Sequence, residues 1–176
     1  MPDVVLVQGA SRGLGLAFVK RLIEPSAASK VIATCRDPNS ALALRELVES
    51  HPQRVTLLRL DVTDEDSLEA VAETVSAVGK PIDLLINCAG VLHSPEGLRP
   101  EKRLQDVCLN NLEQYFRINT IGPLMVAKHL VPLMTRRGRA IIANLSARVG
   151  SISDNRLGGW YGYRASKSAQ NMMTKT

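Results

Sequence analysis

Aromatic residues are scarce in this sequence, which has one Trp, three Tyr and two Phe among 176 residues. A hydrophobic core must therefore be built from Leu, Val, Ile and Ala, the residues that dominate buried parallel sheets. Few aromatic side chains are left for stacking on a ligand, which argues against aromatic-rich recognition modules.

Long apolar runs and a secretion signal are also lacking. No stretch reaches the ~20 apolar residues that a membrane helix needs, because Lys128 and His129 interrupt the longest candidate, residues 121–134. The first residues contain no basic region followed by an apolar segment. The three cysteines form no C-x-x-C pair, and the three histidines have no His or Cys ligand partner three or four residues away. We expect a cytoplasmic protein with reduced thiols, no membrane contact and no metal site.

Neither sign of charge is in large excess, with 22 Lys and Arg residues against 17 Asp and Glu residues and a net charge of +5. With 45% hydrophobic residues, this composition is typical of a globular protein. The densest basic group, residues 136–139, lies at the expected end of a helix, where the helix dipole favours cations. No aromatic residues interleave with it for base stacking, so we expect no nucleic-acid partner.

The spacing of apolar residues alternates five times between strand-like and helix-like, a pattern typical of parallel sheets with crossover helices. The expected strands are residues 4–7, 30–35, 55–60, 82–86 and 140–145. The expected helices are residues 14–23 with Pro25 as the stop, 42–48, 63–78 with Thr63 as the cap, about 111–136 with a bend at Pro123, and 160 or 162 onward. We predict one α/β domain over residues 1–176.

A glycine-rich turn, Gly9-Ala10-Ser11-Arg12-Gly13-Leu14-Gly15, follows the first expected strand. Glycines let the backbone turn sharply and approach a pyrophosphate, whose charge is then met by N–H groups at a helix N-terminus. The spacing is G-x-x-x-G-x-G rather than G-x-G-x-x-G. The alternative for this motif alone is a tight strand-to-helix turn without a ligand.

Two arginines favour NADP(H) over NAD(H) as the cofactor. Arg36 follows the second expected strand, where NAD-binding sheets place a carboxylate for the ribose 2′-hydroxyl, and Arg12 lies within the glycine turn. Arginine binds phosphate through two parallel hydrogen bonds, which suits a 2′-phosphate. The alternatives are that both arginines are surface charges and that Asp37 contacts the ribose.

Five motifs follow one another along the sequence: the loop with Gly9, Ser11, Arg12, Gly13, Leu14 and Gly15, the pair Asp61-Val62, the turn with Asn87, Ala89 and Gly90, then Asn119, and finally Tyr163 with Lys167. In this order they give the sequence a resemblance to the short-chain dehydrogenases/reductases, in particular to their small cytosolic carbonyl reductases. The resemblance implies a Rossmann-type doubly wound parallel sheet with helices on both faces, with five strands present and the family's last strands missing. It also implies that the loop, the pair and the turn bind the cofactor, together with Tyr163 and Lys167.

Tyr163 and Lys167 are four residues apart, so on a helix they lie on one face. A nearby cation favours the phenolate and lowers a pKa that is ordinarily ~10, so we expect Tyr163 to be a usable acid or base. The resemblance implies that Tyr163 protonates a carbonyl oxygen while hydride reaches the carbonyl carbon, that Lys167 binds the nicotinamide ribose, and that Asn119 holds a water. For this pair alone, the alternative is a surface pair on a helix.

The sequence departs from the family pattern in two ways. The family's carbonyl-polarising serine, counted back from Gly150, falls on Ala147, and the hydroxyls that could replace it are those of Ser146, Ser151 and Ser153. The family's two last strands and its substrate-covering segment do not follow the tyrosine helix. We therefore expect a chain that is incomplete at the C-terminus, with residues 140–143 as an apolar sheet edge.

The expected function is NADP(H)-dependent reduction of an aldehyde or ketone, by a protein that the resemblance makes a homodimer or homotetramer. The alternative is a catalytically silent dinucleotide-binding or interaction protein, or an inactive truncated fragment. Asn119, Tyr163 and Lys167 favour the enzyme, whereas Ala147 and the chain length favour the alternative. The sequence does not define which carbonyl compound is the substrate.

Overall fold

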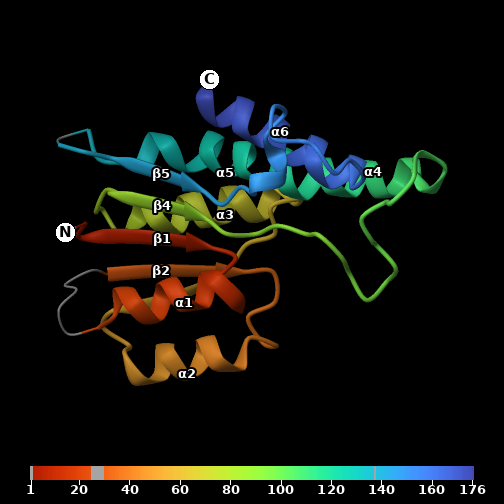
Figure 1. Ribbon diagram of the computed structural model, residues 1–176. Helices are drawn as coiled ribbons and strands as arrows, with labels where there is room; N and C mark the ends of the chain where they lie inside the picture. Colours follow the sequence, from red (N-terminus) through yellow and green to blue (C-terminus); the bar gives the residue numbers. More distant parts are fainter. Residues whose placement is uncertain (1, 25–29, 137) are drawn as a thin grey trace. The chain divides into compact units, whose positions relative to one another are not determined.

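A computed structural model describes residues 2–24, 30–136 and 138–176 (Figure 1). Pro25, the expected helix stop, and Arg137, in the basic group, lie outside these ranges. The contacts divide the chain into two compact units, each described by itself. The first unit is Met1–Ala89 with Met125–Leu145, and the second is Gly90–Leu124 with Ser146–Thr176. The single domain expected from the sequence stays a prediction.

The first unit contains a five-stranded parallel sheet in the order β3-β2-β1-β4-β5. Its strands are β1 (Val4–Gln8), β2 (Lys30–Cys35), β3 (Val55–Arg59), β4 (Leu84–Asn87) and β5 (Ile141–Asn144). All five β1 side chains are buried, as its unbroken apolar run predicts for a central strand. β4 begins later than expected because Ile82 pairs with the chain at Met134 instead of with a strand.

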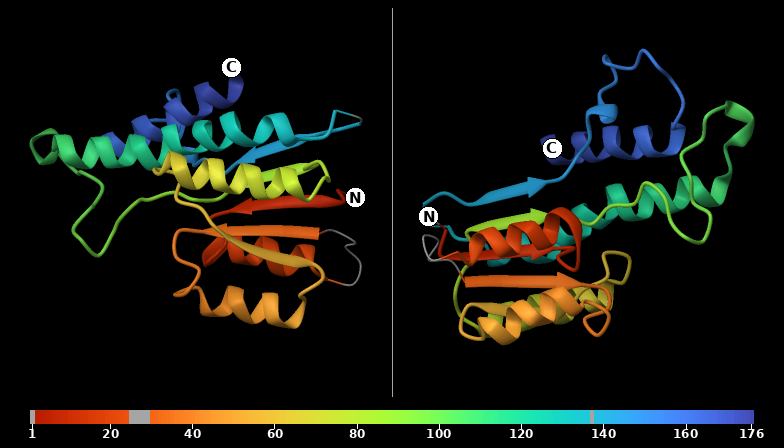
Figure 2. Two further views of the ribbon diagram at one scale, coloured as in Figure 1. Left: turned by 180° about the vertical axis from the view of Figure 1, so that it is seen from behind. Right: turned by 60° about the horizontal axis from the view of Figure 1, so that its bottom comes forward.

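Helices cover both faces of this sheet. They are α1 (Gly13–Leu22), α2 (Leu42–Ser50), α3 (Glu65–Ala77) and the Met125–Leu130 part of α5 (Gly122–Leu130). The chain winds from β1 outward to β3, then crosses to β4 and β5, and right-handed crossovers place the helices of the two halves on opposite faces. Figure 1 shows α1 in front of the sheet and α3 behind it, and the rear view in Figure 2 brings α3 forward. The predicted doubly wound Rossmann-type fold is confirmed.

The N-terminus of α3 differs from the prediction, because its cap is Asp64 and not Thr63. The Asp64 side chain accepts a hydrogen bond from the Ser67 N–H at 3.4 Å. The Thr63 hydroxyl instead donates to Asp61 Oδ1 at 2.8 Å. The Thr63 hydroxyl is therefore bonded to Asp61 and does not cap α3.

The single helix expected over residues 111–136 consists of several segments. They are α4 (Leu109–Phe116), a π-helical turn η2 (Arg117–Ile121), α5, and a 3₁₀ turn η3 (Val131–Leu133), after which helical structure ends. The Gly122 N–H donates to the Arg117 carbonyl, five residues back. Pro123 has no N–H to donate to Asn119 in the α pattern. The irregularity therefore precedes the proline at which the bend was expected.

The second unit contains α4 and η2 together with α6 (Tyr161–Lys175) and the 3₁₀ turns η1 (Leu104–Asp106) and η4 (Arg148–Gly150). α6 packs against α4, and no side chain fits at position 162 between them. A Cβ on Gly162 would lie 2.6 Å from Tyr115 Cδ2 and 2.9 Å from Leu112 Cδ2. The glycine therefore permits the close approach of the two helices, next to Tyr163.

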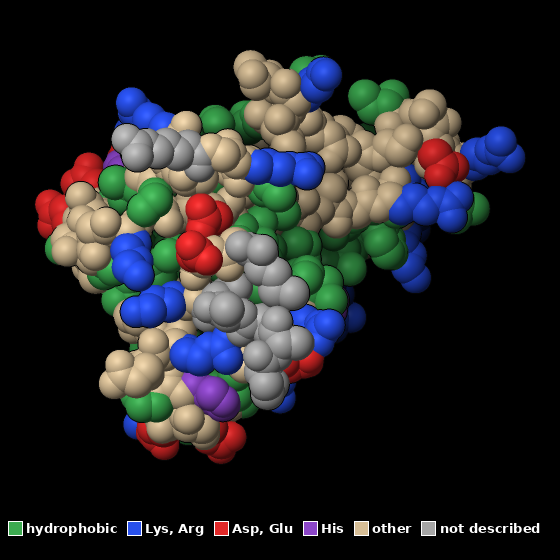
Figure 3. Space-filling model, turned by 90° about the vertical axis from the view of Figure 1, so that its left-hand side faces the viewer, with side chains coloured by type: hydrophobic (Ala, Val, Ile, Leu, Met, Phe, Trp, Pro, Cys, Tyr) green, Lys and Arg blue, Asp and Glu red, His purple; other side chains and the backbone are tan. Residues whose placement is uncertain are grey.

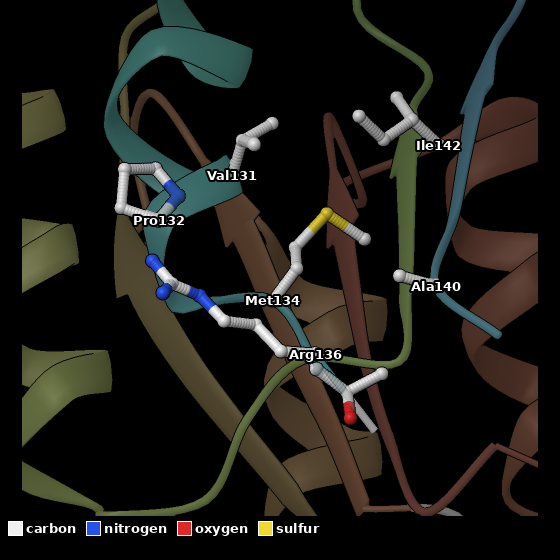
Figure 4. Close-up of a pocket in the computed structure, with 7 residues that line it drawn as sticks. Val131, Pro132, Met134, Arg136, Ala140 and Ile142 are labelled. Atoms are coloured by element: carbon white, nitrogen blue, oxygen red, sulfur yellow. The ribbon is translucent and has the colours of Figure 1, made fainter. Parts of the chain in front are cut away.

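β5 forms an edge of the described sheet, as expected, and exposes apolar side chains there. Ile141 is 40% exposed and Ile142 is 37% exposed. A hollow of about 480 Å³ lies beside this edge, and the Val131, Met134 and Ile142 side chains point into it (Figure 4). None of the expected site residues lines this hollow, so it is not the candidate active site.

The face on which the strands begin has a mixed character. Lys and Arg side chains on the face where the strands begin are interleaved with acidic and apolar ones (Figure 3). The three cysteines are free, as expected. Within the described ranges, no helix combines the length and the apolar character that crossing a bilayer requires.

Candidate active site

The expected cofactor residues of the first unit follow the carboxyl ends of four parallel strands. The loop of residues 9–15 follows β1, Arg36 follows β2, Asp61 and Val62 follow β3, and Asn87 ends β4 two residues before Ala89. Because the carboxyl ends of parallel strands meet at one edge of a sheet, the fold brings these residues together. The edge between β1 and β4, where the winding direction reverses, is the usual ligand position in such sheets.

Two glycines of the loop allow close backbone packing. Gly9 has a φ of +80°, and a Cβ there would lie 2.6 Å from the Ala89 nitrogen. A Cβ on Gly15 would lie 2.2 Å from the Gly9 carbonyl oxygen. The first turn of α1 is therefore seated directly on the strand-to-helix turn. Gly13 is different, because it has a φ of +58° and a Cβ there would meet nothing within 4 Å, so the space beside it is open.

The N-terminus of α1 has the properties of an anion site. Arg12 occupies the cap position without a side-chain capping bond, and the first turn contains no acidic residue. The first N–H groups and the positive end of the helix dipole are therefore available to a phosphate. Arg12 and Arg36 are both exposed, and neither guanidinium makes an ion pair with any described residue.

The acidic residues near this edge are already hydrogen-bonded to their own turns. Asp37 Oδ1 accepts the Asn39 N–H at 3.0 Å, and hydrogen bonds from Ser40 and Asn39 lower the pKa of Asp37. Asp61 Oδ1 accepts the Thr63 N–H at 2.9 Å and the Thr63 hydroxyl at 2.8 Å. Asp37 and Asp61 are thus each held in a fixed orientation by their own turn.

Asn87 is buried and only partly satisfied. Its Nδ2 donates to Asn144 Oδ1 at 2.7 Å, which joins β4 to β5. Its Oδ1 is buried and has no hydrogen-bond partner among the described residues. The Ala89 N–H donates to Gln8 Oε1 at 3.0 Å and holds the next turn. The open space at Gly13, the uncapped helix and the unpaired Asn87 oxygen fit a bound dinucleotide.

Substituting the two helical glycines of the loop should have unequal effects. Gly15→Ala forces a Cβ into the Gly9 carbonyl, so we expect a loss of about 2 kcal/mol or more in unfolding free energy, with loss of NADPH binding. Gly13→Ala meets no atom and should cost only about 1 kcal/mol for its positive φ. Urea unfolding and NADPH titration of both variants measure this. Equal effects would contradict the packing role of Gly15.

Asn119, in the second unit, is buried within the π-helical turn. Its Oδ1 accepts the Val91 N–H at 2.7 Å, and its Nδ2 donates to the Val91 carbonyl at 2.9 Å and to Ser166 Oγ at 3.1 Å. Both amide hydrogens are used, so the side chain can only accept a hydrogen bond from a water. The observed role of the amide is to fix Val91 and α6, and the water role stays a prediction.

Tyr163 and Lys167 lie on one face of α6, as predicted. Lys167 Nζ is 6.0 Å from the centroid of the Tyr163 ring and donates to Gln170 Oε1 at 2.9 Å. A Cβ on Gly90 would lie 3.3 Å from Asn119 Oδ1 and 3.6 Å from Lys167 Nζ. The second unit therefore brings together the four expected residues that belong to it.

The predicted effect of Lys167 on Tyr163 is wrong for the protein without a ligand. Burial raises the pKa of Tyr163 above its ordinary value of 10.0, and burial lowers the pKa of Lys167 to about 8. Loss of hydration outweighs the attraction of a cation 6.0 Å from the ring centroid. Tyr163 therefore keeps its proton at neutral pH, which suits a proton donor.

The lowered Lys167 pKa predicts a pH-dependent stability. Between about 8 and the ordinary value of 10.5, the unfolded chain binds more protons at this lysine than the folded chain, so stability rises with pH across this window. Below the window the full cost of burying the charge is present. We expect Lys167→Met to gain stability relative to wild type at pH 7, and this gain to shrink by about 2 kcal/mol at pH 10.

Urea unfolding at both pH values measures this difference. Lys175→Met, at an exposed lysine on the same helix, is the control and should show a difference that does not depend on pH. A pH-independent difference for Lys167→Met would contradict the burial effect.

The described contacts bring none of the candidate replacement hydroxyls to Tyr163. Ala147 begins the η4 turn. Ser146 Oγ donates to Asn171 Oδ1 at 2.6 Å, and Asn171 lies about 12 Å along α6 from Tyr163 at the usual helical rise. Ser151 Oγ is 3.3 Å from Ser153 Oγ, and Ser151 lines a hollow with Tyr161, Arg164 and Ser168, on a different face of the helix. The expected alternatives to Ala147 therefore gain no support.

Several residues of the site were not identified from the sequence. Gln170 and Ser166 bond to Lys167 and Asn119, and their positions within one turn of Lys167 could have revealed them. Glu101, from a segment far away in the sequence, accepts the Gly162 N–H at the start of the tyrosine helix. Trp160 is the cap residue of that helix. No local pattern relates Glu101 to a helix that begins 60 residues later.

Comparisons with known proteins agree with this geometry. A profile described as short chain dehydrogenase matches residues 3–176. The chain is 36% identical over 149 residues to the uncharacterized oxidoreductase YusZ of Bacillus subtilis, covering 84% of this chain and 49% of YusZ. It thus spans about half the length of that relative.

The solved structures similar to this one include two carbonyl reductases. NADPH-bound carbonyl reductase from chicken fatty liver has a TM-score of 0.86 and 34% identity, covering 98% of this chain and 68% of that one. Carbonyl reductase Sniffer of D. melanogaster has a TM-score of 0.87 and 31% identity, covering 99% of this chain and 73% of that one. The chain belongs to the short-chain dehydrogenase family.

Proposed function

We propose that this chain carries out, or forms the dinucleotide-binding part of a protein that carries out, NADP(H)-dependent reduction of an aldehyde or ketone to an alcohol. The observation that carries the proposal is the cluster of Tyr163, Lys167 and Asn119 in the second unit. The family membership and the NADPH-bound carbonyl reductase among the similar structures support it. A cytoplasmic homodimer or homotetramer is proposed on the resemblance alone.

The cofactor residues fit this reaction. The N–H groups at the start of α1, beside Gly13, would hold the pyrophosphate, and Asp61 with Val62 would contact the adenine. Arg12 and Arg36 would bind a 2′-phosphate. When bound, NADPH supplies the hydride that the reduction needs.

The second-unit residues would handle the proton. Tyr163 is protonated at neutral pH, because its ordinary pKa of 10.0 lies well above 7 and burial raises it further, so its hydroxyl can donate to the carbonyl oxygen as that oxygen gains charge. Lys167 would bind the nicotinamide ribose and stabilise the phenolate that forms. Asn119 would hold the water that returns a proton.

A second candidate is a dinucleotide-binding protein without turnover, and Ala147 favours it. The carbonyl-polarising hydroxyl is absent at that position, and Ser146 is engaged with Asn171. Saturable NADPH binding without oxidation in the presence of any carbonyl compound would support this candidate.

The test of the proposed function is NADPH oxidation with a panel of aldehydes, ketones and quinones. Arg36→Ala should raise the KM for NADPH by about 10- to 100-fold and leave the KM for NADH unchanged, because a charged hydrogen-bond pair to phosphate is lost. Arg45→Ala, an exposed arginine of α2, is the control. Equal KM values of the wild-type protein for NADPH and NADH would contradict the cofactor assignment.

A further inference from the structure

The helix that carries Tyr163 begins from an unusual backbone. Three consecutive residues, Gly158, Gly159 and Trp160, have φ values of +64°, +64° and +55°. Trp160 is the one non-glycine residue with positive φ in the described chain. This conformation is unfavourable for an L-residue with a large side chain and persists only where the surroundings impose it.

Glu101 supplies part of those surroundings from a distant segment. Its main-chain carbonyl accepts the Trp160 N–H, and its Oε2 accepts the Gly162 N–H at 3.2 Å. Glu101 is 3% exposed, and a Cβ on Gly159 would lie 3.3 Å from its carbonyl oxygen. Glu101 thus satisfies two N–H groups at the start of α6, and its carboxyl lies at the positive end of the helix dipole.

The same turn determines the surroundings of the Tyr163 ring. The Trp160 ring meets it edge-on with 6.3 Å between centroids and 76° between planes. The Tyr115 ring meets it at 6.0 Å and 68°. Figures 1 and 2 show the start of α6 beside α4, which carries Tyr115. A change in where α6 begins would therefore move Trp160 and change the packing of the Tyr163 ring.

We propose that Glu101 is a positioning residue for Tyr163, which acts by holding Trp160 and the first turn of α6. This inference rests on the proposed function in that Tyr163 is the proton donor. Glu101 is buried, so we assign it no contact with substrate. Its loss should lower kcat and change cofactor binding little, because the cofactor loop lies on other elements and Lys167, one turn after Tyr163 on α6, keeps its own hydrogen bond to Gln170.

The test uses Trp160 as a reporter, since it is the only tryptophan of the chain. Glu101→Met keeps the side-chain volume but removes the acceptor for the Gly162 N–H. It should shift the Trp160 emission to longer wavelength, raise its quenching by acrylamide about twofold and lower kcat about tenfold, as expected when a buried N–H is left without an acceptor. The KM for NADPH should stay within about twofold. Glu101→Gln retains an acceptor and should restore the wild-type emission and kcat.

Glu113→Met, at an exposed glutamate of α4, is the matched control and should leave all these values at wild-type level. A folded Glu101→Met protein with wild-type emission and quenching would overturn the proposal, as would identical behaviour of Glu101→Met and Glu101→Gln.

Hydrogen exchange of the wild-type protein tests the proposal without any variant. The Gly162 amide should be strongly protected, and rapid exchange would overturn the proposal. A wild-type protein without turnover would contradict the proposed function, while emission and exchange would still decide the role of Glu101.

Discussion

Replacing Tyr163 by Phe is expected to lower the turnover of NADPH with a carbonyl substrate by about 10²- to 10⁴-fold, the usual contribution of a positioned general acid. The ring packing against Trp160 and Tyr115 is retained in Phe, so only the hydroxyl is removed. The Kd for NADPH should change by no more than about twofold, because the loss concerns the transition state. Steady-state kinetics and a fluorescence titration with NADPH measure the two effects.

Tyr161→Phe is the matched control for this experiment. Tyr161 is an exposed tyrosine two residues earlier on the same helix. It lines the hollow with Ser151 and Arg164, on a different face of α6 from Tyr163. It should keep wild-type turnover. If Tyr163→Phe kept wild-type turnover as well, proton donation would have to come from another group.

Replacing Ala147 by Ser is expected to raise turnover by about 10- to 100-fold. A hydroxyl at this position would donate to the carbonyl oxygen, and removal of one such donor typically costs about 10²- to 10³-fold in turnover. The gain is expected to be smaller than that loss, because the surrounding residues are not arranged for the added hydroxyl. The kcat of the variant with its best aldehyde or ketone measures it.

Ala165→Ser, an added hydroxyl at an exposed position of α6, is the control and should have no effect. No gain for Ala147→Ser would show that a carbonyl-polarising donor is not what limits this protein. Loss of activity in Ser146→Ala would instead show that Ser146 leaves Asn171 during the reaction.

The architecture of the first unit could be predicted because its signals are local. The apolar runs of β1 and β2 and the glycine turn between β1 and α1 each define an element within a few residues. The α3 cap was misplaced by one residue because the Thr63 hydroxyl donates to Asp61, and Asp64 accepts the N–H of the first helical turn instead. The π-helical turn before Pro123 had no signal other than the proline.

The candidate site was predictable in its residues and not in its electrostatics. The four-residue spacing places Tyr163 and Lys167 on one face, but their pKa shifts depend on burial by segments far away in sequence. The role of Glu101 could not be predicted for the same reason, because its contact with Gly162 spans 61 positions. The left-handed backbone of Trp160 could not be expected from the sequence either. A positive φ is typical of glycine, and it could be predicted for the two preceding glycines but not for a tryptophan.

The fate of the transferred hydrogen tests the proposed reaction more directly than any other measurement. If this chain reduces a carbonyl compound with NADPH, hydride passes from the nicotinamide to the carbonyl carbon. Wild-type protein incubated with NADPH deuterated at the nicotinamide C4 and an aldehyde should give an alcohol with deuterium on the carbinol carbon, detected by mass spectrometry, and Tyr163→Phe should give almost none. Alcohol without deuterium, or bound NADPH with no alcohol for any carbonyl compound, would contradict this reaction.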